Sequence, residues 1–141
     1  MPHLLLIEDD YQLLRLYTKM LEAGGCTLVS TTTVQAAREM LRRSEQPFDA
    51  CVSDAQVGLI DPSLLLRDLS QIRGKYDVPV LVISAHLEKY QRLCDELRLL
   101  SLAKPFQKNE LLAALAQAIT SHQAGDWINP EATPSMRPRL S

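Results

Sequence analysis

The sequence predicts an α/β fold in which five strands and five helices alternate along the chain. Short apolar runs of strand length are separated by stretches whose apolar residues recur every three or four positions, as on one face of a helix. The runs are continuous rather than alternating, which indicates strands covered on both faces, as in a parallel sheet. We therefore predict a (βα)5 doubly wound parallel sheet with right-handed crossovers.

The predicted strands are apolar runs of four to seven residues. In chain order they are Leu4–Ile7, Cys26–Ser30, Phe48–Ser53, Val78–Ser84 and Leu99–Ala103. The predicted helices lie between and after these runs, each with one apolar face. In chain order these faces are Leu13, Tyr17, Met20 and Leu21; Val34, Ala37 and Leu41; Leu65, Leu69 and Ile72; Leu87, Tyr90, Cys94 and Leu97; and Leu111 or Leu112 with Leu115, Ala118 and Ile119.

Turn-forming residues mark several helix ends. Gly24 and Gly25 are expected to end the first helix, and Gly74 the third. Asp61 followed by Pro62 is typical of a helix N-cap with proline at the first helical position. We predict one domain over residues 1–121. Residues 122–141 carry three prolines and no clear periodicity, and we expect a tail or the start of a linker there, from which Trp127 and Ile128 could pack back.

Composition narrows the function classes. The net charge of −2 gives no electrostatic footprint for nucleic acid, so we expect no direct binding to it. No apolar run approaches the ~20 residues that span a bilayer, so we expect no membrane segment. Cys26, Cys51 and Cys94 form no CxxC pair, and we expect them to be small buried residues in a reducing cytosol.

The first predicted strand runs directly into three acids, Glu8, Asp9 and Asp10. Close carboxylates repel, at a cost on the order of a few kcal/mol per pair at an effective dielectric near 20. Two interpretations explain how this repulsion is offset. Either the acids are solvated in a loop that starts a helix, or they hold a cation.

Further polar residues follow the other predicted strands. Asp54, Ser84 and Lys104 stand at the ends of the third, fourth and fifth runs, and the carboxyl ends of parallel strands meet at one edge, where such sheets bind ligands. Considered alone, Asp54 could be a turn residue, Ser84 a helix cap and Lys104 a solvated lysine. Their coincidence at one edge favours a site. Carboxylates suit Mg²⁺, Asp54 could act as a nucleophile that forms an aspartyl phosphate, and Lys104 and Ser84 could hold phosphoryl oxygens.

Four pieces of the chain resemble the receiver domain of two-component response regulators, and the resemblance spans about Pro2 to Ser121. The pieces are IEDD at Ile7–Asp10, SDAQVGLIDP at Ser53–Pro62, VISA at Val82–Ala85 and AKPF at Ala103–Phe106. The resemblance implies the flavodoxin-like strand order 2-1-3-4-5. It further implies that Asp54 is the phosphoacceptor. Ser84 would be the Ser/Thr whose hydroxyl takes part in the family's conformational switch, and Lys104 would be the invariant lysine of the family.

The resemblance also implies a cofactor, Mg²⁺. Asp9 and Asp54 would be direct ligands, Glu8 would act mainly through water, and the backbone carbonyl of Gln56 would complete the protein ligands. The Lys104–Pro105 peptide bond is expected to be cis.

Several positions depart from the family pattern. Gly58 stands where proline is usual, and Asp61–Pro62 replaces an Asp–Gly pair. Ser101 stands at the switch position that normally carries Tyr or Phe, which predicts a smaller conformational change on phosphorylation. Gln56 and His86 are expected to flank the phosphoryl group, although His86 also reads as an exposed residue at a helix start.

We therefore expect a cytoplasmic signalling domain and not an enzyme, apart from catalysis of its own phosphorylation and dephosphorylation. A histidine kinase or phosphotransfer protein would supply the phosphoryl group, and the surface of the fourth helix, fifth strand and fifth helix would change for a downstream effector domain or protein. Such a domain can also form a homodimer. We expect no output domain after Ser121, either because the protein is a single-domain regulator or because an effector domain has been removed.

Three alternatives compete with this interpretation. A pseudo-receiver would use the same fold as an interaction module without phosphorylation, although the acids, Ser84 and Lys104 argue against it. A haloacid-dehalogenase-type phosphatase would need a second acid two residues after Asp54, where this chain has Gln56. A dinucleotide oxidoreductase would need a GxGxxG motif after the first strand, and the sequence has none there.

Overall fold

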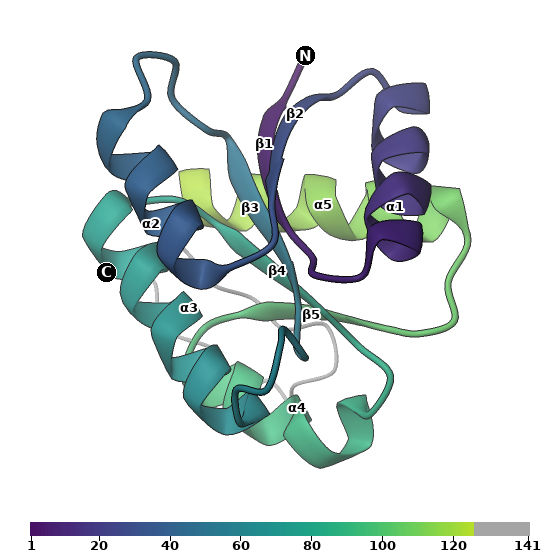
Figure 1. Ribbon diagram of the computed structural model, residues 1–141, viewed down its shortest axis with the longest axis vertical. Helices are drawn as coiled ribbons and strands as arrows, with labels where there is room; N and C mark the ends of the chain where they lie inside the picture. The colour runs from purple at the N-terminus through teal and green to yellow at the C-terminus, as the bar shows by residue number, and fades with distance from the viewer. Residues whose placement is uncertain (126–141) are drawn as a thin grey trace.

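The centre of the molecule is a five-stranded parallel sheet with the strand order β2-β1-β3-β4-β5 (Figure 1). The structure is a computed structural model, and it describes residues 1–125. The strands are β1 (His3–Ile7), β2 (Thr27–Thr31), β3 (Ala50–Asp54), β4 (Val80–Ser84) and β5 (Leu100–Ala103). The predicted doubly wound sheet and its strand order are thus confirmed.

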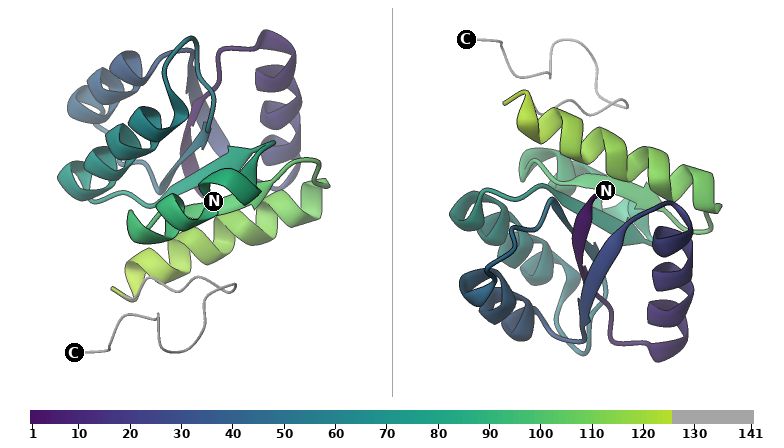
Figure 2. Two further views of the ribbon diagram at one scale, coloured as in Figure 1. Left: turned by 90° about the horizontal axis from the view of Figure 1, so that it is seen from below. Right: turned by 90° about the horizontal axis from the view of Figure 1, so that it is seen from above.

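One helix follows each strand, as predicted. The helices are α1 (Tyr11–Ala23), α2 (Val34–Arg43), α3 (Pro62–Tyr76), α4 (Leu87–Glu96) and α5 (Lys108–Gln123). They form two outer layers, with α1 and α5 on one face of the sheet and α2, α3 and α4 on the other (Figure 2).

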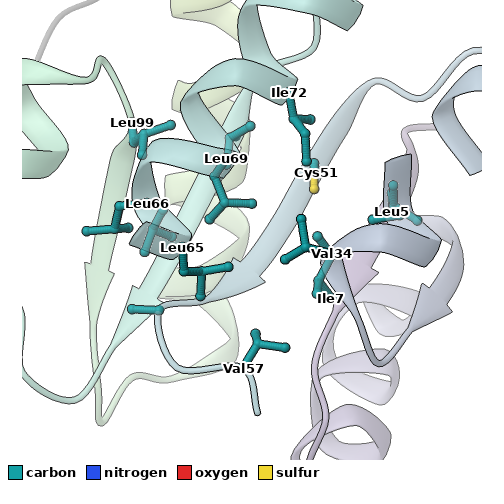
Figure 3. Close-up of a cluster of buried hydrophobic side chains, with 14 of the residues drawn as sticks. Leu5, Ile7, Val34, Cys51, Val57, Leu65, Leu66, Leu69, Ile72 and Leu99 are labelled. Atoms are coloured by element: carbon teal, nitrogen blue, oxygen red, sulfur yellow. The ribbon is translucent and has the colours of Figure 1, made fainter. Parts of the chain in front are cut away.

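The sheet is buried on both faces because alternate side chains of a strand point to opposite sides. In β1, Leu4 and Leu6 pack under α1 and α5, whereas Leu5 and Ile7 pack under α2 and α3. Figure 3 shows this second cluster, to which α3 contributes four buried apolar residues. They are Leu65, Leu66, Leu69 and Ile72, all fully buried. The two clusters hold the strand ends in fixed positions, which is what a site at the edge of the sheet requires.

Most of the predicted helix ends are confirmed. Gly24 is the C-cap of α1, and Gly25 follows it with a left-handed φ of 90°, which glycine adopts without steric cost. The side chain of Asp61 caps α3 by accepting a hydrogen bond from the Ser63 amide, and Pro62 is the first helical residue.

Two local expectations are wrong. Gly74 does not end α3, which continues to Tyr76 because Asp77 instead takes the left-handed conformation, with φ 52°, and its amide bonds the Arg73 carbonyl. The strand β2 is not covered on both faces, since Thr27, Val29 and Ser30 are exposed. This strand is at the edge of the sheet and pairs only with β1 in the described structure.

The three cysteines are free and buried, as expected. No helix in the described part of the chain is long and apolar enough to cross a membrane. The division between the domain and a tail after residue 121 stays a prediction, because residues 126–141, including Trp127 and Ile128, lie outside the described residues.

Candidate functional site

The carboxyl edge of the sheet gathers the side chains that the sequence analysis singled out. Asp54 is the last residue of β3 and Ser84 the last of β4, while Glu8 directly follows β1 and Lys104 directly follows β5. The strands are parallel and in register, so these ends meet at one edge. The structure therefore brings four of the predicted site residues together.

Asp54 is the centre of this group and is only 5% exposed. The ammonium group of Lys104 donates a hydrogen bond to its Oδ2, and the two side chains form an ion pair. The amide of Gln56 donates to its Oδ1 over 2.9 Å. Both carboxylate oxygens thus have a hydrogen-bond donor, and the two bonds fix the orientation of the side chain.

Lys104 is held from two sides. Its Nζ lies 6.0 Å from the centre of the Tyr17 ring, which in turn packs against Phe106 with ring centres 5.6 Å apart. Burial lowers the pKa of Lys104, but the hydrogen bond and negative charge of Asp54 outweigh burial and leave that pKa above its ordinary value. The lysine therefore stays a cation beside Asp54. Helical spacing predicts Tyr17 only as a core residue, because it cannot show how close the ring lies to Lys104.

Glu8 is a buried acid at this edge, and its ionised form is disfavoured. It is 1% exposed, and its Oε2 accepts a hydrogen bond from the Asp10 amide over 3.2 Å, whereas its Oε1 has no hydrogen-bond partner in the described structure. Burial, with repulsion from Asp54 in addition, raises the pKa of Glu8 to about 8. A buried carboxylate oxygen without a protein partner is costly, so this oxygen is suited to contact a cation or an ordered water.

The other two acids of the cluster have separate roles. Asp10 is the N-cap of α1, and its Oδ1 accepts hydrogen bonds from the amides of Gln12 and Leu13. Asp9 is exposed, and its Oδ2 accepts from the Gly58 amide over 2.8 Å. The helix-start reading thus holds for Asp10. In residues 1–125, no three acidic, histidine or cysteine side chains converge into a ready-made metal cage.

Ser84 is 4% exposed, and its Oγ accepts a hydrogen bond from the His86 amide over 3.0 Å. His86 is the N-cap residue of α4, although its side chain caps nothing. Its ring is exposed, with Nδ1 3.9 Å from a carboxylate oxygen of Glu88. The hydroxyl of Ser84 therefore orders the turn that begins α4.

A cavity of about 260 Å³ opens beside these groups. Asp54, Gln56, Ser84 and Lys104 line it, as the sequence analysis would place them. The rest of its lining consists of Ala55, Pro62, Ala85, His86 and Tyr90. Sequence reasoning missed Pro62 and Tyr90 as site residues, because each lies on a helix and reaches the cavity only through the packing of that helix.

The remaining predicted residues lie apart from the cavity. Ser101 is half-buried in β5 and is not part of the lining. Its Oγ donates to Oε1 of Gln91 on α4 over 3.4 Å, and Nε2 of Gln91 donates to Asp95 over 2.8 Å. Ser101 thus joins β5 to α4 by a polar contact. The Lys104–Pro105 peptide bond is cis, which confirms the expectation for it.

Comparison with known proteins identifies the fold family. The sequence model of the response regulator receiver domain matches residues 4–116. The chain is 32% identical over 117 residues to Protein PetR from Rhodobacter capsulatus, covering 79% of this chain and 46% of PetR. It is 30% identical over 136 residues to the KDP operon transcriptional regulatory protein KdpE from Escherichia coli, covering 92% of this chain and 56% of KdpE. The chain spans about half the length of these two curated relatives.

Solved structures agree. A sensor protein from Polaromonas sp. JS666 superposes with a TM-score of 0.74 at 28% identity, over 86% of this chain and 98% of that one. The receiver domain of the sensor histidine kinase PA1611 from Pseudomonas aeruginosa, whose structure has a magnesium ion coordinated in the active site cleft, superposes with a TM-score of 0.70 at 24% identity. It covers 85% of this chain and 98% of its own, and at that identity it shows the shared fold.

Proposed function

Because this chain belongs to the response regulator receiver family, we propose that Asp54 accepts a phosphoryl group from a histidine kinase or a phosphotransfer protein. Receiver domains are signalling phosphoacceptors that act with histidine kinases and effectors in two-component systems. The single observation that best supports the role of Asp54 is its position. It is a buried carboxylate at the end of β3, paired with Lys104, and it lines a cavity open to a donor.

The residues present also fit a bound Mg²⁺. Asp9, Asp54 and the carbonyl of Gln56 would hold it directly, and Glu8 would act through water. The partnerless Oε1 of Glu8 supports this fit, as do the oxygen donors, which are those that Mg²⁺ prefers. When bound, the ion would neutralise the acids and the charge that develops on the phosphoryl oxygens. The magnesium ion in the receiver domain of PA1611 gives independent support.

The protein's own groups perform the transfer in this proposal. An oxygen of Asp54 attacks the phosphorus of a phosphohistidine, the phosphorus–nitrogen bond breaks, and the imidazole leaves with the bonding electron pair. Lys104 then exchanges its hydrogen bond to Asp54 for one to a phosphoryl oxygen, and it supplies positive charge there. Ser84 would rotate toward another phosphoryl oxygen and donate its hydroxyl to it, and this rotation would break the hydrogen bond that it now accepts from the His86 amide.

The release of that amide suggests how the signal spreads. Ser84 orders the start of α4, and Ser101 joins α4 to β5, so a shift of Ser84 would move the surface formed by α4, β5 and α5. A downstream effector domain or protein would read that surface. A full change between two populations requires about 5.5 kcal/mol of differential binding. The effector, a homodimer and the cytoplasmic location stay predictions.

The test of the proposal is labelling by a small phosphodonor. We expect the wild-type chain to be labelled in the presence of Mg²⁺. We expect it to stay unlabelled when a chelator is present in place of Mg²⁺. Asp54→Asn should abolish labelling. Asp68→Asn is the matched control, because Asp68 is a partly exposed carboxylate on α3 that contacts Arg38, outside the site. Labelling of Asp54→Asn would disprove the assignment, and an unlabelled wild-type chain would favour the pseudo-receiver alternative.

A further inference from the structure

On the α4 side, the phosphoacceptor cavity is lined by one tyrosine, Tyr90. Tyr90 lines the cavity together with Asp54, Ser84 and Lys104, and it comes from a different element than any of them. The other groups around Asp54 are polar or small, apart from Pro62 at the start of α3. Tyr90 is thus the only residue with a six-membered aromatic ring in the described lining of this cavity.

The position of the Tyr90 ring follows from the packing of α4. The residue lies one turn into the helix, is half-buried, and packs with Leu93 and Leu97 against the core cluster under α3. Its neighbour Gln91 accepts the hydrogen bond from Ser101 of β5. The helix is therefore fixed to the core on one side and to β5 on the other, and these contacts place the ring at the cavity.

The cavity has room for more than a phosphoryl group. Its volume of about 260 Å³ is several times the ~30 Å³ that one water occupies in the liquid. Water in that space can hydrolyse an acyl phosphate, because a water oxygen can attack the phosphorus. The phosphorus–oxygen bond to Asp54 then breaks, the carboxylate is restored, and inorganic phosphate leaves with the protons of the water.

We propose that the Tyr90 ring shields phosphorylated Asp54 from water on the α4 side and so sets the lifetime of the phosphorylated state. The inference rests on the proposed function. An apolar ring face offers water no hydrogen-bond partner, so it occupies cavity volume that water would otherwise fill. Tyr90 acts here by keeping water away from the phosphoryl group. The ring, and not the hydroxyl, produces this effect.

The lifetime of the acyl phosphate tests this proposal. The chain is labelled with a small phosphodonor and Mg²⁺, the donor is removed, and release of inorganic phosphate is followed with time. Tyr90→Ala should lose phosphate several-fold faster than the wild-type chain, and Tyr90→Phe should match the wild type because it keeps the ring. Arg92→Ala is the matched control, since Arg92 is exposed on the same helix, pairs with Glu96 and does not line the cavity.

A second measurement covers the case in which Tyr90→Ala does not fold. In the wild-type chain, beryllofluoride with Mg²⁺ should shift the ring resonances of Tyr90 more than those of Tyr76, which lies at the far end of α3. Equal lifetimes for Tyr90→Ala and the wild type would overturn the proposal, as would a shortened lifetime for Tyr90→Phe or Tyr90 resonances that do not move. A wild-type chain that is never labelled would instead refute the proposed function on which the inference depends.

Discussion

The backbone amide of Gly58 donates a 2.8 Å hydrogen bond to the carboxylate of Asp9 and so ties the loop after β3 to the loop after β1. Gly58 has a φ of 60°, in the left-handed region that favours glycine, and a Cβ there would meet no atom within 4 Å. The contact needs an amide hydrogen, which proline lacks. Glycine at this position therefore gives Asp9 a backbone donor that a proline would remove.

We expect Gly58→Pro to weaken Mg²⁺ binding several-fold, because Asp9 loses the donor that orients its carboxylate and because the loop must leave the positive φ, which proline cannot adopt. Amide NMR shifts in a titration with Mg²⁺ alone measure this affinity. Gly58→Ala is the control. It keeps the amide and should keep the affinity, while the positive φ lowers its free energy of unfolding by about 1 kcal/mol. Unchanged Mg²⁺ affinity in Gly58→Pro would show that the contact does not position Asp9.

Glu8→Gln should stabilise the metal-free protein. The pKa of Glu8 is raised to about 8, so at neutral pH the folded chain must take up a proton at this buried acid. A neutral amide avoids that cost, and we therefore expect the free energy of unfolding to rise by about 1 kcal/mol. The same variant should gain less stability than the wild type when Mg²⁺ is added. Urea unfolding with and without Mg²⁺ measures both effects, and Glu22→Gln, an exposed position on α1, is the control. A less stable metal-free Glu8→Gln would contradict the expectation.

Two glycines in or beside helices should respond in opposite directions to alanine. Gly74 is exposed inside α3, and a Cβ at this position would meet nothing within 4 Å, so Gly74→Ala should stabilise by about 0.5–1 kcal/mol. At Gly24 a Cβ would come within 2.4 Å of the Leu112 side chain, which must move. Gly24→Ala should therefore be neutral or destabilising. Thermal unfolding of the pair measures the difference, and a destabilised Gly74→Ala would contradict the prediction.

The thiols should be inert in the folded protein. Burial raises the pKa of Cys51 from 9.0 to about 12, and burial, followed by the charge of Asp95, does the same for Cys94. Because the folded state disfavours the thiolate, the stability from these groups is fully present below pH 9 and is lost as the pH rises toward 12. A disulfide reagent at mildly alkaline pH should react slowly with the native chain and quickly after unfolding in urea. Fast reaction of the native protein at Cys51 or Cys94 would be the contrary result.

Periodicity and apolar runs were sufficient to predict the order and type of all ten elements, because burial under two helical layers imposes those patterns directly. Capping was harder to predict. Gly74 carries the usual signal for a helix end, yet Asp77 ends α3, since the chain can take a left-handed conformation at Asp as well as Gly.

The candidate site could also be predicted only in part. The residues at strand ends, such as Asp54 and Ser84, could be predicted because the topology alone brings them together. The contacts of Tyr17 with Lys104, of Gly58 with Asp9, and of Tyr90 with the cavity could not. Each depends on how a helix or loop packs onto a segment distant in the sequence, and a local pattern does not encode that distance.

Lys104 joins the end of β5 to the ends of two other strands, β3 and β4. Its side chain donates to Asp54, and its amide donates to the Ser84 carbonyl over 2.9 Å. The strand β5 that ends beside it is at the edge of the sheet, with β4 as its only neighbour in the described structure. An edge strand has hydrogen bonds to one neighbouring strand rather than two, so we expect a displacement of the Lys104 ammonium group to move the end of β5 more readily than the ends of β3 and β4.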